Sequence, residues 1–166
     1  MHPRRVGTFT QSSLSLVEAI VKEVVGKNII ELGAGQGPIT RRILDNLPED
    51  GNLIAFEIDK RFCKNLEKIK DSRLKVICDC VLDSKDYLQD INYEIDCIVS
   101  GLPLTSLDKN QARGILDFCS KSKRFIQYKY FKSDKLLRDY FSEIRVEKVS
   151  RNLPPALIYI CSNEMN

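Results

Sequence analysis

The chain has 166 residues, a length that fits one domain. Hydrophobic residues make up 43% and charged residues 30%, a balance typical of globular proteins, and the formal net charge of +3 is too small to indicate a nucleic-acid partner. No run approaches the roughly 20 apolar residues of a membrane span, and the basic residues 1–5 lead into no apolar signal segment, so we expect a cytoplasmic protein.

Short runs rich in β-branched residues alternate with longer amphipathic segments, a pattern that predicts a parallel sheet flanked by helices. A first helix is expected to be capped by Ser12 or Ser13 and ended by Gly26. Further helices are predicted at 38–47, from Asp59 through Ile69, from Asp108 through Cys119, and at 133–141. The runs that predict strands are 27–32, 52–57, 74–79, 95–100, 123–130, 145–149 and 156–161.

The last two predicted strands have no helix between them. We expect them to be antiparallel neighbours, because a parallel pair needs a long connection. The sequence therefore predicts a single α/β domain over residues 1–166, with a seven-stranded, mostly parallel sheet and an antiparallel last strand. Residues 1–8 are expected to form a mobile tail.

The six cysteines indicate no metal site. The chain contains no CxxC pair, and its one histidine is His2, whereas a zinc site needs four ligands in a recognisable spacing. We therefore expect no bound metal, and we interpret the cysteines as small core residues in a reducing compartment.

Three glycines mark the turn from the first strand into the next helix. Gly33, Gly35 and Gly37 follow Glu31, and Pro38 suits a first helical turn. Glycines there allow a tight turn and a close approach to a ligand, and the amides that follow favour an anionic group. Three spaced glycines are also compatible with a tight turn that binds nothing.

Polar residues at the ends of the next strands strengthen the prediction of a nucleotide site. Glu57 ends the second strand about 20 residues beyond the glycines, where an acid commonly binds ribose hydroxyls. Asp79 ends the third strand and can accept a hydrogen bond from an adenine amine, and Ser100 ends the fourth. Ligands of open α/β sheets bind at these carboxyl ends.

The order E-x-G-x-G-x-G differs from the G-x-G-x-x-G of dinucleotide sites and resembles the class I methyltransferases. The resemblance implies a three-layer Rossmann-like fold and S-adenosyl-L-methionine as cofactor. It implies that the glycine loop faces the methionine part, Glu57 the ribose and Asp79 the adenine. The predicted cofactor-binding residues are Ser12, Ser13, Glu31, Gly33, Gly35, Gly37, Glu57, Ile58, Asp79, Cys80 and Ser100.

A narrower resemblance, to the bacterial phospholipid N-methyltransferases, covers nearly the whole chain. It rests on FTQSS at 9–13, SGLP at 100–103, FIQYKY at 125–130 and NLPPA at 152–156. It implies transfer to a head-group amine such as that of phosphatidylethanolamine. The chain is also similar to the group that contains the ribosomal RNA adenine dimethyltransferases, whose motif is Asn-(Leu/Ile)-Pro-Tyr. In this chain Ser100 and Gly101 stand where the motif has its asparagine, and Leu104 stands where it has its tyrosine. A flipped RNA base would therefore lack an aromatic side chain on which to stack.

For the transfer itself we predict a role for Ser100, Gly101 and Leu102, whose carbonyls can orient the acceptor amine, and for Tyr130. The predicted substrate-binding residues are Tyr128, which shares a strand face with Tyr130, and Arg151 and Asn152. Both tyrosines are equally compatible with a role as core aromatics. No residue stands out as a general base.

We therefore expect an N-methyltransferase that acts on an amine-bearing lipid. RNA adenine methylation and a cofactor-binding protein without catalysis are the alternatives. Contact with an anionic membrane at its inner face would be weak and salt-sensitive, because it would rely on scattered basic residues such as Arg4, Arg5, Lys129 and Lys132. Nucleic acid is the less favoured partner, and the sequence leaves the oligomeric state open.

Overall fold

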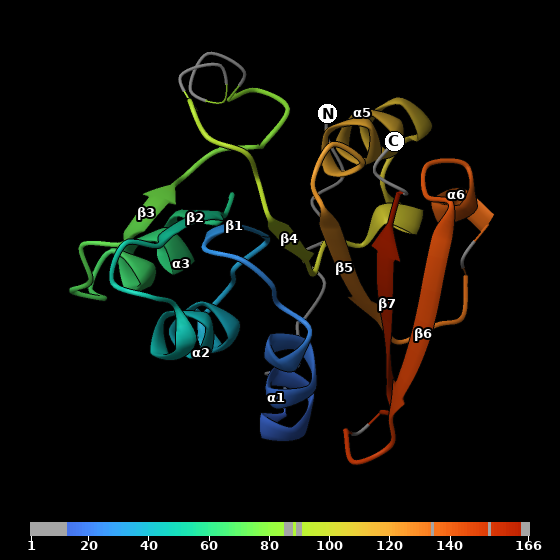
Figure 1. Cartoon of the computed structure of the whole chain (residues 1–166), viewed down its shortest axis with the longest axis horizontal. Helices are drawn as coiled ribbons and strands as arrows, with labels where there is room; N and C mark the ends of the chain where they lie inside the picture. The colour runs from blue at the N-terminus through green and yellow to red at the C-terminus, as the bar shows by residue number, and fades with distance from the viewer. Residues whose placement is uncertain (1–12, 85–87, 89–90, 134, 153, 164–166) are drawn as a thin grey trace.

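The computed structural model describes residues 13–163 apart from 85–87, 89, 90, 134 and 153. The strands of this part form one seven-stranded sheet in the order β3-β2-β1-β4-β5-β7-β6 (Figure 1). Strands β1 to β5 are parallel, and β7 is antiparallel to both of its neighbours, β5 and β6. The predicted fold class is confirmed. The strands are β1 (Asn28–Leu32), β2 (Asn52–Phe56), β3 (Leu74–Ile77), β4 (Cys97–Ser100), β5 (Arg124–Lys129), β6 (Glu143–Val149) and β7 (Ala156–Ser162).

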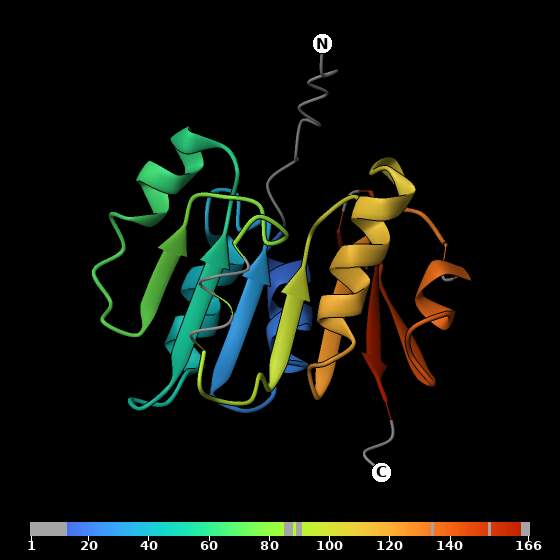
Figure 2. The ribbon, with the colours of Figure 1, turned by 90° about the horizontal axis from the view of Figure 1, so that it is seen from above.

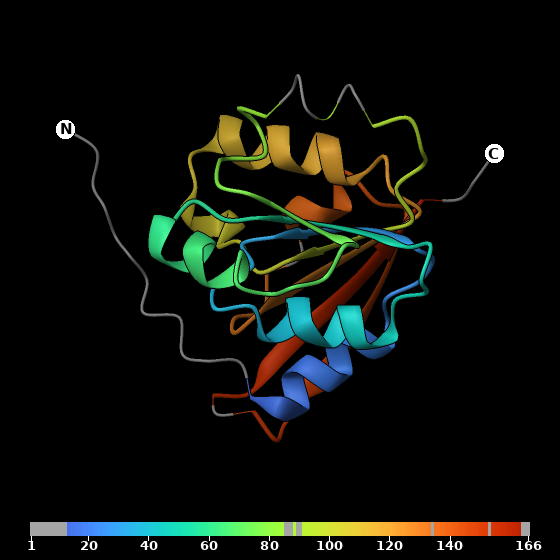
Figure 3. The same cartoon turned by 90° about the vertical axis from the view of Figure 1, so that its left-hand side faces the viewer.

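Helices cover both faces of the sheet and make the three layers. Helices α1 and α2 lie on one face, and α5 and α6 lie on the other (Figures 2 and 3). Among the described residues no helix is long and apolar enough to cross a membrane. The helices are α1 (Leu14–Lys22), α2 (Pro38–Asn46), α3 (Lys60–Leu66), α5 (Lys109–Cys119) and α6 (Lys135–Arg138), and a 3-10 turn spans Leu104–Ser106.

The helix starts follow the capping residues that the sequence indicates. The side chain of Ser13 accepts a hydrogen bond from the amide of Leu16, and Asp59 and Asp108 cap α3 and α5 in the same way. Apolar side chains pack into two clusters, one on each face of the sheet. Successive strand residues point to opposite faces, so Val99 of β4 packs on the α1 side and its neighbour Ile98 packs on the α5 side. Ser12 and residues 1–8 lie outside the described residues.

Gly26 does not end the first helix, contrary to the prediction. Helix α1 ends at Lys22, and Glu23 caps it in a right-handed conformation. Gly26 instead adopts a φ of 76° at a crowded position, where a Cβ atom would lie 2.2 Å from Cβ of Asp96. The Asp96 carboxylate accepts hydrogen bonds from the amides of Lys27 and Asn28. Gly26 therefore makes room for the acid that holds the start of β1.

The expectation that all the cysteines are free core thiols was wrong for one pair. Cys63 of α3 and Cys78, which follows β3, form a disulfide with a Cα–Cα distance of 5.8 Å. Cys78 is exposed, and Cys80 is a partly buried free thiol. The other three, Cys97, Cys119 and Cys161, are buried free thiols as expected. The pairing depends on how α3 packs beside the end of β3, which spacing along the chain does not reveal.

The disulfide should stabilise the fold by restricting the unfolded chain. It joins residues 15 positions apart, and closing a loop of this length is worth about 3 kcal/mol in the chain-entropy treatment. We predict that the double variant Cys63→Ser, Cys78→Ser loses about this much free energy of unfolding in urea titrations. Cys80→Ser is the matched control and should unfold like the wild type. Equal midpoints for the double variant and the wild type would contradict the prediction.

Candidate functional site

The predicted site residues that the structure describes converge on the carboxyl edge of the sheet. Strand β1 lies between β2 and β4. The chain leaves β1 toward β2 and leaves β4 toward β5, in opposite directions along the sheet, and ligands of open α/β sheets bind where the connections separate in this way. The amide of Gly101 donates to the carbonyl of Leu32 at 3.0 Å, and a Cβ atom on Gly33 would lie 3.0 Å from Cδ2 of Leu102. The glycine loop after β1 and the Ser100–Leu102 loop after β4 are therefore in direct contact.

The glycine loop leaves open space in front of its middle glycine. Gly35 has a φ of 56°, a left-handed conformation that glycine adopts most readily, and a Cβ atom placed there would meet nothing within 4 Å. Gly37, the N-cap of α2, is by contrast crowded, because a Cβ atom would lie 2.8 Å from the side chains of Arg41 and Leu66. A ligand can therefore approach the backbone at Gly35.

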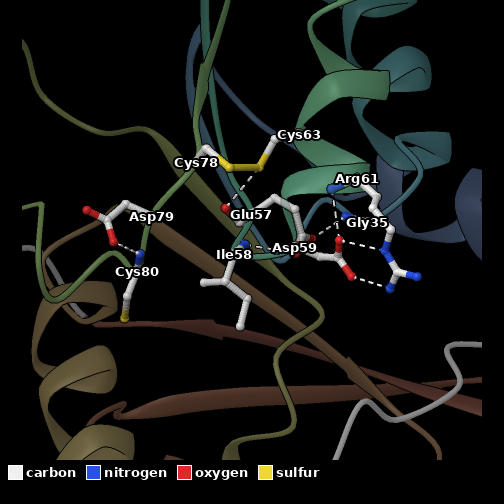
Figure 4. The surroundings of a disulfide bond; sticks show 9 residues. All are labelled: Gly35, Glu57, Ile58, Asp59, Arg61, Cys63, Cys78, Asp79 and Cys80. Atoms are coloured by element: carbon white, nitrogen blue, oxygen red, sulfur yellow. Dashed lines mark hydrogen bonds and ion pairs between the residues drawn. A yellow bond between two sulfur atoms is a disulfide. The ribbon is translucent and has the colours of Figure 1, made fainter. Parts of the chain in front are cut away.

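The carboxylate of Glu57 joins the glycine loop to the end of β2. Its Oε2 accepts a hydrogen bond from the amide of Gly35 at 2.7 Å, and its Oε1 accepts from the amides of Ile58 and Asp59 at 2.8 Å each. Glu57 itself is buried, whereas the neighbouring Ile58 side chain is 74% exposed. The pair thus offers a fixed carboxylate beside a largely exposed apolar side chain (Figure 4).

Asp79 lies near Cys78 of the disulfide, to the left of Glu57 in Figure 4. Asp79 is exposed, and its Oδ1 accepts a hydrogen bond from the amide of Cys80 at 2.8 Å. The sulfur of Cys63 lies 3.4 Å from the carbonyl oxygen of Glu57, and its partner Cys78 directly precedes Asp79. The disulfide therefore links the segments that carry the two predicted acids, a feature that the sequence reasoning missed.

Glu31 is a buried acid beneath the glycine loop. It is 2% exposed, and the hydroxyl of Thr40 on α2 donates to its Oε2 at 2.6 Å. Burial raises the pKa of Glu31 to about 8; the hydrogen bond from Thr40 acts in the opposite direction, and the nearby charge of Glu57 adds to the rise. Glu31 therefore carries a proton at neutral pH.

The Ser100–Leu102 loop is held by a hydrogen bond within it and by side chains of β5. The Oγ of buried Ser100 accepts from the amide of Leu102 at 3.2 Å, while Nε2 of Gln127 donates to the carbonyl of Leu102 at 3.1 Å. The hydroxyl oxygen of Tyr128 would lie 2.2 Å from a Cβ atom on Gly101, so only glycine fits there. Gln127 belongs to the FIQYKY segment, yet its role was missed, because it depends on the register of β4 and β5.

The remaining predicted residues lie along the same edge. Tyr128 and Tyr130 pack against the same apolar cluster, as expected for one strand face. Arg151 is exposed. Asn152 is buried: its Oδ1 accepts from the amide of Ser13 at 3.2 Å, and its Nδ2 donates to the carbonyl of Pro154 at 2.6 Å. Its amide thus ties the start of α1 to the β6–β7 connection, and a substrate contact by Asn152 or Arg151 stays a prediction.

Comparison with known proteins assigns the chain to a family. The family model described as ribosomal RNA adenine dimethylase matches residues 12–116, more than half of the chain. The chain belongs to this family. The enzyme is therefore an S-adenosyl-L-methionine-dependent methyltransferase, as the resemblance implied.

One relative and two solved structures illustrate the similarity. An ornithine lipid N-methyltransferase from Singulisphaera acidiphila is 31% identical, over 96% of this chain and 90% of that protein. A putative rRNA methylase from Clostridium thermocellum has a TM-score of 0.66 at 16% identity, covering 90% of this chain and 94% of that one. A precorrin-6Y C5,15-methyltransferase from Geobacter metallireducens has a TM-score of 0.69 at 14% identity, covering 90% and 87%. The two structures support the fold alone.

The raised pKa of Glu31 predicts a pH dependence of stability. Between pH 4.5 and about 8, Glu31 is protonated in the folded methyltransferase and ionised in the unfolded chain. The free energy of unfolding should therefore fall as the pH rises through this window, by on the order of 3–5 kcal/mol, and level off above it. Glu31→Gln cannot ionise and should lack this contribution. Urea unfolding of both proteins between pH 5 and 9 tests the prediction, and parallel pH profiles would contradict it.

Proposed function

We propose that this methyltransferase transfers a methyl group to the amine of a membrane lipid. The observation that carries the proposal is the 31% identity to an ornithine lipid N-methyltransferase over 96% of the chain. The position of Leu104 supports it. Leu104 is 7% exposed and packs in the apolar cluster beneath α5, so the position where the RNA enzymes carry an aromatic belongs here to the core. A flipped adenine would find no ring there on which to stack.

The carboxyl edge suits each part of the cofactor. The open space before Gly35 would receive the methionine part, whose carboxylate is compatible with the amides at the start of α2. Each carboxylate oxygen can accept two hydrogen bonds, and Oε2 of Glu57 accepts only one from the described residues, which leaves an acceptor position for a ribose hydroxyl. Exposed Ile58 would pack on the adenine, with Asp79 and Cys80 at its amine. Ser12 and Ser13 complete the proposed set.

When bound, the cofactor supplies an electrophilic methyl group on a sulfonium. The protein's task is to align the acceptor nitrogen with it, which can contribute several kcal/mol through positioning alone. Carbonyls of Ser100 and Gly101 would accept the hydrogens of the amine, while Gln127 holds the carbonyl of Leu102. The amine must be neutral to use its lone pair, and desolvation beside the buried Ser100 favours that form. Tyr130, at the end of β5, would flank the head group, with Tyr128 behind it.

RNA adenine methylation is the second candidate. The match of residues 12–116 to the ribosomal RNA adenine dimethylase model favours it. The two candidates share the cofactor, the loop at Ser100–Leu102 and an amine as acceptor, so only the acceptor distinguishes them.

An acceptor screen tests the proposal. Methyl-labelled cofactor is incubated with the enzyme and with vesicles that contain phosphatidylethanolamine or ornithine lipid, or with ribosomal RNA. We expect label in the amine lipids and none in RNA. Vesicles of phosphatidylcholine are the matched control, since a quaternary nitrogen has no lone pair to accept a methyl group. Label in RNA alone would overturn the proposal, and cofactor binding without transfer to either acceptor would indicate a protein without catalysis.

A further inference from the structure

Phe131 projects from the carboxyl edge of the sheet. It lies two residues beyond the end of β5 and is 81% exposed, more than the other exposed large apolar residues in the described part of the chain, Leu14, Ile58 and Val146. Its neighbour Tyr130 by contrast packs against the core. A large aromatic side chain in water is unfavourable unless something covers it.

The turn that carries Phe131 is braced. The amide of Ser133 donates to the hydroxyl of Tyr159 at 3.2 Å, and Nζ of Lys129 donates to the carbonyl of Ser133. The same ammonium lies 4.3 Å above the ring of Tyr159. These contacts of Lys129 within the fold hold the turn that carries Phe131, and its expected part in membrane attraction stays a prediction.

A second exposed apolar segment precedes β7, at the end of the sheet where β5 leads into this turn. Strand β5 pairs with β7 in a register that joins Tyr128 to Ile158 and Lys129 to Leu157. Phe131 follows Lys129 by two residues and Pro155 precedes Leu157 by two, so both lie just beyond the last paired residues at the same end of the two strands. Pro154 and Pro155 are both exposed.

Two exposed cations flank these apolar residues: Lys132 follows Phe131, and Arg151 lies on the β6–β7 connection. We call this surface the docking rim: Phe131, Lys132, Arg151, Pro154 and Pro155. It contains two positive charges and no acid, and the sequence of residues 129–135 as a whole has three lysines and one aspartate.

The docking rim adjoins the loop that would receive the acceptor. Tyr128, three residues before Phe131, contacts Gly101 with its hydroxyl, so β5 connects the rim to the Ser100–Leu102 loop. The rim and this loop therefore follow the carboxyl ends of two neighbouring parallel strands, β5 and β4. Aromatic and proline side chains between basic residues suit the interface of a bilayer, where rings enter among the head groups and cations lie near phosphates.

We propose that the docking rim seats the enzyme on an anionic bilayer, with Phe131 inserted among the head groups. This proposal rests on the proposed function, because it assumes that the acceptor amine belongs to a bilayer lipid. Phe131 is the docking residue, and Lys132 and Arg151 add electrostatic attraction to the same surface.

The variant Phe131→Ser tests the proposal, with Val146→Ser as the matched control. Val146 is 45% exposed in the middle of β6, away from the carboxyl edge. Flotation with vesicles that contain phosphatidylglycerol should show about 10-fold weaker binding for Phe131→Ser and no change for Val146→Ser. Lys132→Gln should weaken the same binding about 5-fold and make it less sensitive to salt. The thermal midpoints of all three should match the wild type, because each side chain is exposed.

Activity measurements separate docking from catalysis. Phe131→Ser should lose about 10-fold in transfer to an amine lipid in vesicles, yet keep wild-type transfer to the same head group on a short-chain, monomeric lipid. Unchanged vesicle binding of Phe131→Ser would overturn the docking proposal, and so would an equal loss on the monomeric lipid. A wild type that binds the vesicles but methylates neither form would leave docking supported and overturn the proposed function.

Discussion

The carboxylate of Glu57 is the contact on which the rest of the site depends. A buried carboxylate is unfavourable unless donors replace its lost hydration, and here three backbone amides do so, from Gly35, Ile58 and Asp59. The three amides belong to the glycine loop and to the start of α3. One charge therefore fixes the relative positions of two loops that would otherwise be independent. A site held in this way needs little rearrangement when a ligand binds.

The other groups of the site follow from that arrangement. Glu31 lies near the same negative charge, and its burial keeps it protonated, so the region beneath the glycine loop carries one negative charge rather than two. The disulfide between Cys63 and Cys78 holds α3 against the end of β3, next to the carbonyl of Glu57. On the other side of β1, Gln127 and Tyr128 fix the Ser100–Leu102 loop. The proposed cofactor side and the proposed acceptor side are thus each held by the strands beside them.

The sequence revealed the parts that depend on local patterns. Apolar periodicity located the strands, capping residues such as Ser13 and Asp108 located helix starts, and the acids at strand ends marked the carboxyl edge. The features that could not be predicted from the sequence depend on packing between segments that are far apart along the chain. Cys63 pairs with Cys78, which is 15 residues away in the sequence. The side chain of Asp96 occupies the space beside Gly26, so that position requires a glycine. The exposure of Phe131 follows from a turn braced by Tyr159, 28 residues away in sequence.

The Glu57 carboxylate organises the glycine loop, and we propose that it also binds the cofactor ribose. Titration calorimetry of Glu57→Gln with S-adenosylhomocysteine tests it most directly, with Glu67→Gln, an exposed acid at the end of α3, as control. The amide cannot accept from all three backbone donors and a hydroxyl. The affinity of Glu57→Gln should therefore fall about 10- to 100-fold, as expected for lost hydrogen bonds to a charged group, while the control binds like the wild type. Wild-type affinity in Glu57→Gln would contradict the account.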